Sequence, residues 1–303
     1  MKASTLPGAL VHKRDTAEIL LTDWRELGPD RFELSARWPA SHPFYRTADG
    51  GHSPLLLVET VRQAIPLLSH AAYGAPLDHR QSWCDLSLTV DPAALAAADS
   101  RHPVELRVSC SDVVRRAGRL VSLRMAVQVL ADGVPLARVH TGFVNHPPAI
   151  YRRLRGDRAD PERARAGAPP LLPPLPPARV GREHHTDVVL APARRDDRTQ
   201  LRVDLSHPVL FDHPVDHVPG MLLLEAAQQA AHAACRSRPG LVVGMDSVFA
   251  RYAEFDAVCD VTAAPLDPHP EDRPGRRRFV VSATQDRTCV FSTVVTLDDA
   301  PGR

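Results

Sequence analysis

The sequence predicts an α+β protein made of two tandem domains, each a long antiparallel sheet wrapped round a central helix. A very apolar stretch with one glutamate occurs twice, as PLLLVETVRQA at 54–64 and as GMLLLEAAQQA at 220–230. Segments of alternating polarity follow both copies, and a proline-rich stretch separates them. The repeat distance of roughly 166–169 residues is too long for a solenoid, so it indicates two domain-sized copies of one unit.

The similarity extends upstream of the two apolar stretches. VHKRDTAEILLT at 11–22 can be laid on VGREHHTDVVLA at 180–191, and RFELSARWP at 31–39 can be laid on QLRVDLSHP at 200–208. The first pair places an acidic residue before an apolar run in both copies. We therefore predict that the whole unit was duplicated, and not the helix alone.

In the first copy, residues 54–72 predict a helix that is apolar nearly all round and hence buried. Pro66 should kink this helix or mark a separate turn. Alternation then predicts strands at 82–90, 103–114, 119–133 and 134–145. The ADG sequence between the last two predicts a tight hairpin.

The second copy repeats this order, with a helix predicted at 219–236. Strands are predicted at 241–255, 256–265, 276–285 and 287–297. A sheet must wrap each helix, because only that covers a surface that is apolar on all sides. A single unit would leave an open sheet edge, so we expect the two copies to pair edge to edge as an internal pseudo-dimer.

The domain boundaries follow from composition. We predict a first domain at 1–150, a proline- and arginine-rich linker at 151–179 and a second domain at 180–303. The density of prolines argues against helix interiors and sheet ladders in the linker. Its PPLPP run could serve as a ligand for an aromatic groove, but the position between two repeats favours a spacer.

Composition narrows the class of protein. The formal net charge of +1 gives no electrostatic reason to expect nucleic-acid or membrane binding. The cysteines form no CxxC pair, which favours buried free thiols in a reducing compartment. The first residues lack a signal-peptide core, and no apolar run reaches the length of a membrane span. We therefore expect a soluble cytoplasmic protein.

Glu59 and Glu225 are the first candidates for chemistry, since each lies in an apolar helix. A buried carboxylate needs hydrogen bonds or a cation, and a water-poor site could raise its pKa for general acid/base work. The alternative is a structural carboxylate favoured by the helix N-terminus. Polar neighbours on the same helices favour the functional interpretation; they are Arg62, Gln63, Gln228 and Gln229.

The segments before the two helices carry histidines. HPVLFDHPVDHVPG at 207–220 includes His213 and His217 beside aspartates, and the first copy offers the weaker HPFYRTADGGHSP at 42–54 with His52. Metal binding is the less favoured interpretation, because prolines interrupt any helix that would align the ligands. A histidine acting with the following glutamate, or simply exposed in a loop, remains open. No motif for a nucleophilic serine or cysteine occurs.

A histidine-bearing loop that enters a buried helix of the form PGMLLLEAAQQA resembles the hot-dog fold of β-hydroxyacyl thioester dehydratases. A more extensive resemblance is to the A-factor biosynthesis (AfsA-type) family of γ-butyrolactone autoregulator synthases. It rests on VHKRDTAEILLTDWRELGPDRFELSARWP, HSPLLLVETVRQA and FDHPVDHVPGMLLLEAA. Members of that family are two fused hot-dog repeats, which agrees with the duplication.

The resemblance implies an acyltransferase that joins a β-ketoacyl thioester to dihydroxyacetone phosphate and gives a butenolide-type precursor. The acyl donor would be acyl carrier protein or acyl-CoA, with no cofactor beyond the phosphopantetheine arm and no metal. It implies a monomer or homodimer with no nucleic-acid or membrane partner. We predict Glu59, Glu225 and His213 as catalytic residues. The predicted substrate-binding residues are Arg62, Gln63, Gln228, Gln229, His217 and His52.

The family usually carries arginine three residues after the second glutamate, where this chain has Gln228. Either Arg62 supplies the cation, or the substrate differs, or the chain has lost the activity. Two other functions therefore stay open: a hot-dog dehydratase or thioesterase acting on acyl thioesters, and a non-catalytic acyl or small-molecule binding protein.

Overall fold

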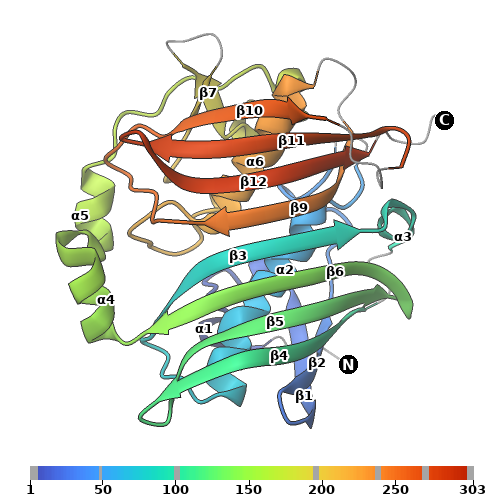
Figure 1. Cartoon of the computed structure of the whole chain (residues 1–303), viewed down its shortest axis with the longest axis vertical. Coiled ribbons are helices and arrows are strands. Elements are labelled where there is room, and N and C mark those ends of the chain that lie inside the picture. Colours follow the sequence, from blue (N-terminus) through green and yellow to red (C-terminus); the bar gives the residue numbers. More distant parts are fainter. Residues whose placement is uncertain are drawn as a thin grey trace. The chain divides into compact units, whose positions relative to one another are not determined.

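The structure, a computed structural model, describes residues 6–47, 50–98, 103–193, 198–235, 240–267 and 273–298. The chain divides into two compact units. The first unit comprises Met1–Arg46 and His52–Asp157, and the second comprises Thr47–Gly51 and Arg158–Arg303. Each unit contains a central helix and an antiparallel sheet (Figure 1).

The first unit has the strand order β1-β2-β4-β5-β6-β3, with every neighbouring pair antiparallel. The strands are β1 (Leu21–Gly28), β2 (Arg31–Ala36), β3 (Arg80–Val90), β4 (Val104–Arg116), β5 (Arg119–Ala131) and β6 (Val134–His146). Short helices α1 (Gly8–Val11), α3 (Pro92–Ala97) and α4 (Pro148–Arg155) surround it. The strands predicted at 82–90, 103–114, 119–133 and 134–145 are confirmed within a few residues.

The hairpin predicted at ADG is also confirmed. Asp132 and Gly133 both have positive φ, 50° and 75°, which is the backbone of a type I′ turn. This turn matches the twist of β5 and β6 and fixes their register. The sequence analysis missed the β1–β2 hairpin, because β1 buries little of its length and so lacks the apolar alternation of a half-buried strand.

The central helix of the first unit is α2 (Pro54–Leu67), as predicted. Ser53 caps it by accepting a hydrogen bond from the Leu55 amide, and Pro54 occupies the first turn, where its missing N–H costs nothing. Every residue of α2 except Arg62 is buried. The helix continues past Pro66 and then widens into a π-helical turn, η2 (Leu68–Ala72), so the predicted interruption falls just after the proline.

The second unit has the strand order β9-β12-β11-β10-β8-β7, again antiparallel throughout. Its strands are β7 (Leu190–Pro192), β8 (Thr199–Leu201), β9 (Leu241–Phe249), β10 (Asp260–Leu266), β11 (Arg276–Gln285) and β12 (Thr288–Asp298). Helix α6 (Gly220–Ala234) packs against β10, β11 and β12, and Met221 through His232 are all buried.

Two predicted strands of this unit are shorter than expected, since residues 250–259 leave the sheet. The Gln285 side chain explains part of this difference. Its amide nitrogen donates to the carbonyls of Glu254 and Ala257, and its oxygen accepts from the Glu254 amide. These backbone groups are thereby satisfied away from a ladder.

The segment at 151–179 contains more helix than predicted. Helix α4 ends inside it and α5 (Pro161–Ala166) lies wholly within it. Both helices carry proline at the start, the position where proline is compatible with a helix. Asp160 caps α5 by accepting from the amides of Glu162 and Arg163. The expectation that proline density excludes helix here is therefore wrong.

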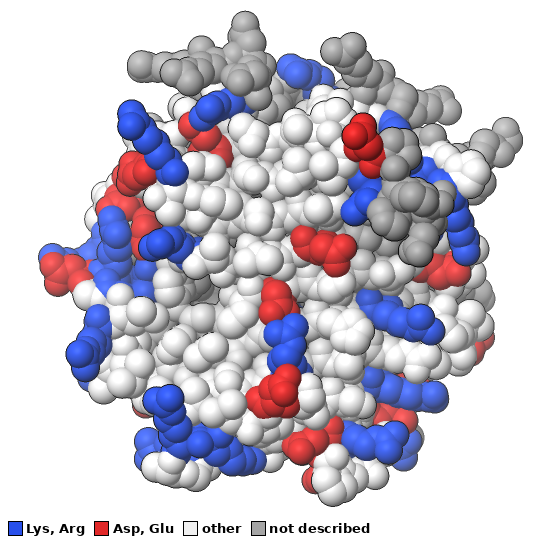
Figure 2. Space-filling model, in the orientation of Figure 1, with Lys and Arg blue, Asp and Glu red and all other residues white. Residues whose placement is uncertain are grey.

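Two surface properties bear on function. Acidic and basic side chains are interspersed on the face shown in Figure 2, as a net charge near zero suggests. Across the described parts of the chain, no helix combines the length and the apolar character needed to span a membrane.

Candidate active site

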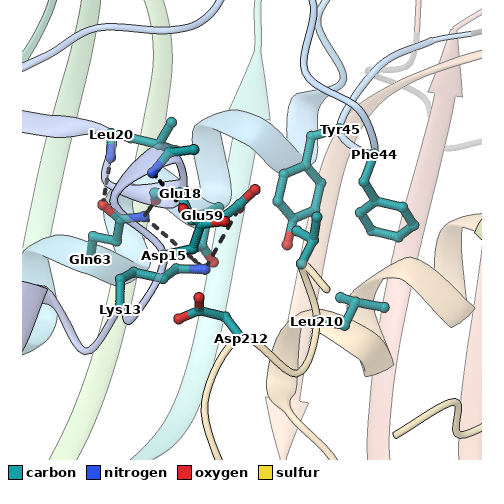
Figure 3. A network of polar contacts seen from close by, with 12 residues as sticks. Lys13, Asp15, Glu18, Leu20, Phe44, Tyr45, Glu59, Gln63, Leu210 and Asp212 are labelled. Atoms are coloured by element: carbon teal, nitrogen blue, oxygen red, sulfur yellow. Dashed lines mark hydrogen bonds and ion pairs between the residues drawn. The ribbon is translucent and has the colours of Figure 1, made fainter. Parts of the chain in front are cut away.

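The carboxylate of Glu59 lies in the interior of the first unit, on α2, with 1% of the residue exposed. Arg62, one turn later, approaches it as a fork: Nε donates to Oε2 and Nη2 donates to Oε1, both at 2.8 Å. The Nζ of Lys13 lies 3.1 Å from Oε1 (Figure 3). Two cations from two different segments therefore neutralise one buried anion.

The electrostatics of Glu59 reverse the expectation of a raised pKa. Burial opposes ionisation and acts to raise the pKa, but Arg62 and Lys13 outweigh it together with the hydrogen bonds from Arg62 and Gln63. The pKa of Glu59 is consequently held well below its usual value. Such a carboxylate is ionised at neutral pH and accepts protons poorly, so the prediction of a raised pKa is wrong here.

Gln63 connects α2 to the segment that precedes β1. Its amide nitrogen donates to the Glu18 carbonyl at 2.7 Å and to Glu59 Oε1 at 3.0 Å, while its oxygen accepts from the Leu20 amide at 2.9 Å. Figure 3 shows Gln63 beside Leu20, Glu18 and Glu59, with its hydrogen bonds as dashed lines. Both donors are used inside the protein, so Gln63 holds the Glu59 carboxylate in place.

The second unit repeats this arrangement around Glu225, which is fully buried. Gln229 donates to the Asp187 carbonyl at 2.8 Å and to Glu225 Oε1 at 2.6 Å, and accepts from the Val189 amide at 2.9 Å. The cation here is Arg182, whose Nε donates to Oε1 at 2.8 Å and whose Nη2 lies 2.5 Å from Oε2. Gln229 therefore holds Glu225 as Gln63 holds Glu59, and the role of both glutamines in substrate binding stays a prediction.

Lys13 and Arg182 were not among the predicted site residues, although a signal for them existed. Laying 11–22 on 180–191 places Lys13 on Arg182 and the acidic Glu18 on Asp187. A cation repeated ahead of each carboxylate helix would have identified the partners. Composition and helical spacing alone could not, because each pair is more than forty residues apart in sequence.

The position three residues after each glutamate differs between the units. Arg62 binds Glu59 and keeps 20% of its side chain exposed. Gln228 is 7% exposed, and its Oε1 is buried without a hydrogen-bond partner among the described residues. Since Arg182 already binds Glu225, Gln228 is not needed to neutralise that carboxylate. The two carboxylate centres thus lie on equivalent helices, α2 and α6, but the position three residues after the glutamate carries a cation in α2 and an amide in α6.

A buried histidine lies beside the first centre. His42 is 1% exposed, and its Nδ1 accepts from the amides of Phe44 and Tyr45 at 3.1 and 3.0 Å. Nδ1 is therefore unprotonated, and the hydrogen of a neutral ring lies on Nε2, 3.4 Å from Glu18 Oε2. Glu18 in turn lies 3.9 Å from the Nζ of Lys13. The histidine is thus built into the network around Glu59.

The second unit contains the same local motif. His207 Nδ1 accepts from the amides of Val209 and Leu210 at 3.3 and 3.2 Å. The SHP sequence at 41–43 is therefore the counterpart of SHP at 206–208. Laying RFELSARWP on QLRVDLSHP had paired Pro39 with Pro208, whereas the shared histidine motif pairs Pro43 with Pro208. The predicted alignment is therefore wrong at its end, by four residues.

The other predicted histidines occupy three separate settings. His52 Nε2 lies 3.0 Å from the Pro39 carbonyl, and its ring packs edge-on against Trp38, so it supports the loop before α2. His213 Nδ1 lies 3.6 Å from Asp212, beyond hydrogen-bonding distance. The remaining histidine, His217, makes a 2.8 Å contact with the carboxylate of its neighbouring aspartate.

The fold defines a tandem hot-dog protein, since each unit wraps an antiparallel sheet round a buried helix. The overall likeness extends to a putative oleoyl thioesterase from Lactobacillus plantarum. That structure superposes with a TM-score of 0.52 at 11% identity, over 91% of this chain and 99% of that one. At this identity the likeness shows the fold alone.

The family model described as "A-factor biosynthesis hotdog domain" matches residues 2–145 and 164–297, and the chain belongs to this family. A 2-oxo-3-(phosphooxy)propyl 3-oxoalkanoate synthase from Streptomyces virginiae is 44% identical over 292 residues, which cover 96% of this chain and 97% of the relative. A synthase of the same name from Streptomyces coelicolor is 37% identical, over 97% of this chain and 91% of the relative. The resemblance found in the sequence is confirmed.

Proposed function

We propose that this chain is an acyltransferase that joins a 3-oxoacyl group, carried as a thioester, to dihydroxyacetone phosphate. The hydroxyl oxygen of the acceptor attacks the thioester carbonyl carbon, a C–O bond forms and the C–S bond breaks. The thiol takes up the proton that the hydroxyl loses. The product is the phosphorylated 3-oxoalkanoate ester named in the relatives from Streptomyces virginiae and Streptomyces coelicolor.

The observation that supports this function in the structure is the Arg62–Glu59 pair. A phosphate group requires a fixed cation, and arginine offers a planar fork suited to it. Glu59 holds the Arg62 guanidinium by two hydrogen bonds, while a fifth of the arginine side chain stays exposed. Lys13 adds a second positive charge beside the same carboxylate. The pair can therefore present a preorganised cation to an anionic substrate.

The roles of the site residues follow from these contacts. Glu59 acts as a fixed anion that orients Arg62, because its depressed pKa makes it a poor base. Glu225 acts in the same way in the second unit, where it orients the guanidinium of Arg182. Gln228 contacts substrate through its Oε1, a buried oxygen that has no hydrogen-bond partner in the described part of the chain.

The ester made in this step contains an acidic carbon between two carbonyl groups and a ketone in the glycerone part. Intramolecular condensation with loss of water would close the ring of a butenolide phosphate. We propose this compound as the precursor of a signalling molecule. The acyl donor is acyl carrier protein or acyl-CoA, since both present the acyl group on a phosphopantetheine arm.

Mass spectrometry of the purified protein with a 3-oxoacyl thioester and dihydroxyacetone phosphate tests this function. The expected result is a new species at the mass of the phosphorylated ester or of its dehydrated butenolide. Thioester hydrolysis or dehydration without ester would replace the proposal with the general hot-dog chemistry. Unchanged thioester would exclude condensation of these two substrates.

Arg62→Gln tests the phosphate role. We expect KM for dihydroxyacetone phosphate to rise about 10–100-fold, because a charged hydrogen bond contributes about 1.5–3 kcal/mol, with little change in KM for the thioester. Arg107→Gln is the matched control, since Arg107 is an exposed arginine of β4 that pairs with Glu105. An unchanged KM for the phosphate in Arg62→Gln would remove Arg62 from the binding site.

A further inference from the structure

The carboxylate of Glu18 lies in the same network as Glu59, but its surroundings are different. Glu59 receives hydrogen bonds from Arg62 and Gln63 and lies 3.1 Å from the Nζ of Lys13. Glu18 is 7% exposed, and its Oε2 lies 3.9 Å from the same Nζ (Figure 3). This oxygen is buried without a hydrogen-bond partner among the described residues. Glu18 therefore contributes a buried acceptor that is not used within the described part of the chain.

The Nε2 of His42 is an unused donor beside this acceptor. Its Nδ1 accepts from the amides of Phe44 and Tyr45, so the neutral ring carries its hydrogen on Nε2. Nε2 lies 3.4 Å from Glu18 Oε2, yet it too is buried and has no hydrogen-bond partner in the part of the chain that the structure describes. Buried polar groups nearly always have partners, so an unused donor beside an unused acceptor indicates a place for a ligand.

A hydroxyl group fits this pair. It donates through its hydrogen and accepts through its oxygen. Its hydrogen can point to Glu18 Oε2 while its oxygen accepts from His42 Nε2, because two atoms 3.4 Å apart can both lie within hydrogen-bonding distance of a third. A carbonyl group could use only His42, and an ammonium group could use only Glu18. Among the functional groups of a substrate, the pair therefore favours an alcohol.

The pair lies in the unit that contains the proposed phosphate site. Successive contacts of 2.8 to 3.9 Å lead from Arg62 through Glu59 and Lys13 to Glu18. These residues and His42 all belong to the first unit. Dihydroxyacetone phosphate carries its free hydroxyl at one end of a short carbon chain and its phosphate at the other. With its phosphate at Arg62, it can direct the hydroxyl toward Glu18 and His42 without a group from the second unit.

We infer that Glu18 and His42 bind the free hydroxyl of dihydroxyacetone phosphate and that Glu18 is the general base of the acyl transfer, an assignment that rests on the proposed function. Glu18 Oε2 takes the hydroxyl proton as the oxygen attacks the thioester carbonyl carbon and the C–O bond forms. When the C–S bond breaks, the protonated Glu18 gives this proton to the leaving sulfur. His42 stays neutral throughout, and its Nε2–H holds the hydroxyl oxygen and stabilises the negative charge that develops on it.

Glu18→Gln tests the base, because the carboxamide keeps the size and an acceptor oxygen but does not take up the proton. We expect kcat to fall about 10²–10⁴-fold, the usual contribution of a positioned acid or base, while KM for dihydroxyacetone phosphate changes less than about threefold. Glu18→Asp keeps a carboxylate and should recover part of kcat. Glu105→Gln is the matched control, since Glu105 lies on β4 and pairs with the exposed Arg107.

His42→Asn tests the donor while keeping the loop. An asparagine oxygen can accept from the amides two and three residues later, as His42 Nδ1 does, but the shorter side chain ends before the position of Nε2. We expect KM for dihydroxyacetone phosphate to rise about 3–10-fold, the contribution of one neutral hydrogen bond, with KM for the thioester unchanged. A lower urea midpoint with unchanged KM would show a structural role and overturn the assignment. His140→Asn, at an exposed histidine of β6, is the control.

A binding measurement separates this inference from the proposed function. Isothermal titration calorimetry without thioester compares dihydroxyacetone phosphate with hydroxyacetone phosphate, which lacks the free hydroxyl. The wild type should bind the first about tenfold more tightly or better, because the second leaves buried polar groups unpaired, and His42→Asn should lose most of this preference. That preference without any ester product would refute the acyl transfer and retain the hydroxyl site. Equal binding of the two phosphates by an ester-forming wild type, or full turnover by Glu18→Gln, would refute the inference alone.

Discussion

Replacing Gln229 by methionine should destabilise the second unit strongly, and the structure gives the reason. The carboxamide joins three groups that lie on different segments: the Val189 amide, the Asp187 carbonyl and the carboxylate of Glu225. Methionine has nearly the same length but neither donates nor accepts strongly. The substitution therefore removes the hydrogen bonds without leaving a large cavity.

The magnitude follows from what is left unpaired. Val189 and Asp187 are 3% and 9% exposed, so water cannot readily replace the lost partners of their backbone groups. A buried group left unsatisfied costs about 1–3 kcal/mol, which gives about 2–6 kcal/mol for the two backbone groups together. Glu225 loses one donor but keeps Arg182, so we do not expect its charge to add greatly to the loss.

Gln228→Met is the matched control, since it is the same substitution one residue earlier on the same buried helix. Gln228 Oε1 has no hydrogen-bond partner among the described residues. Replacing it with an apolar side chain should therefore leave the free energy of unfolding unchanged or raise it by up to about 1 kcal/mol.

Urea unfolding followed by circular dichroism measures both variants, with thermal melts as a second readout. A domain of this size should lose about 2–4 °C of Tm for each kcal/mol. Equal losses of stability in Gln228→Met and Gln229→Met would refute the reasoning, because they would show that the helix tolerates neither change regardless of hydrogen bonding.

Three further predictions concern the same two centres. The pKa of Glu59 is depressed in the folded protein, so its ionised form stabilises the fold above the unfolded pKa of about 4.3, and this contribution is lost as pH falls below that value. The difference in free energy of unfolding between wild type and Glu59→Gln should therefore shrink from pH 7 to pH 3. A constant difference in urea unfolding would contradict this. Arg182→Met leaves the fully buried Glu225 without its cation and should cost about 3–5 kcal/mol, which the added change Glu225→Gln should partly restore; no recovery in the double variant would count against a charge effect. Gly181 has φ +69°, and a Cβ there would overlap His232 Nδ1. Gly181→Ala should therefore lower the free energy of unfolding by about 2 kcal/mol or more. A Tm within about 1 °C of the wild type would show instead that the His232 ring moves aside without cost.

The duplicated core was predictable because its signals are local. Residues 54–64 and 220–230 are apolar on nearly all sides of a helix, which the sequence shows directly. The ADG turn requires positive φ at two residues, and aspartate and glycine adopt it more readily than most residues. The hairpin of β1 and β2 was missed because β1, an edge strand that is mostly exposed, shows no apolar alternation. The helices α4 and α5, which begin at Pro148 and Pro161, were not predicted, because a proline at a helix start was interpreted as a helix breaker.

The candidate site was predictable only in part. The sequence singled out Glu59 and Glu225 from a physical rule, that a carboxylate in an apolar helix requires partners. It did not supply those partners, because Lys13 and Arg182 reach the carboxylates from segments distant along the chain. It also grouped Gln63 and Gln229 with the substrate-binding residues, and it could not show that each donates to a backbone carbonyl and to the carboxylate of its own helix.

The sequence by itself determined the two repeats, their central helices, most of the strands and the family of the protein. These properties depend on periodicity and on residue identity along the chain. Only the tertiary structure decided that Glu59 is an ionised anion held by two cations, and that His217 lies at hydrogen-bonding distance from the buried Asp216. The physical reason is that pKa and hydrogen bonding depend on distances of a few ångströms between groups that the chain order does not bring together.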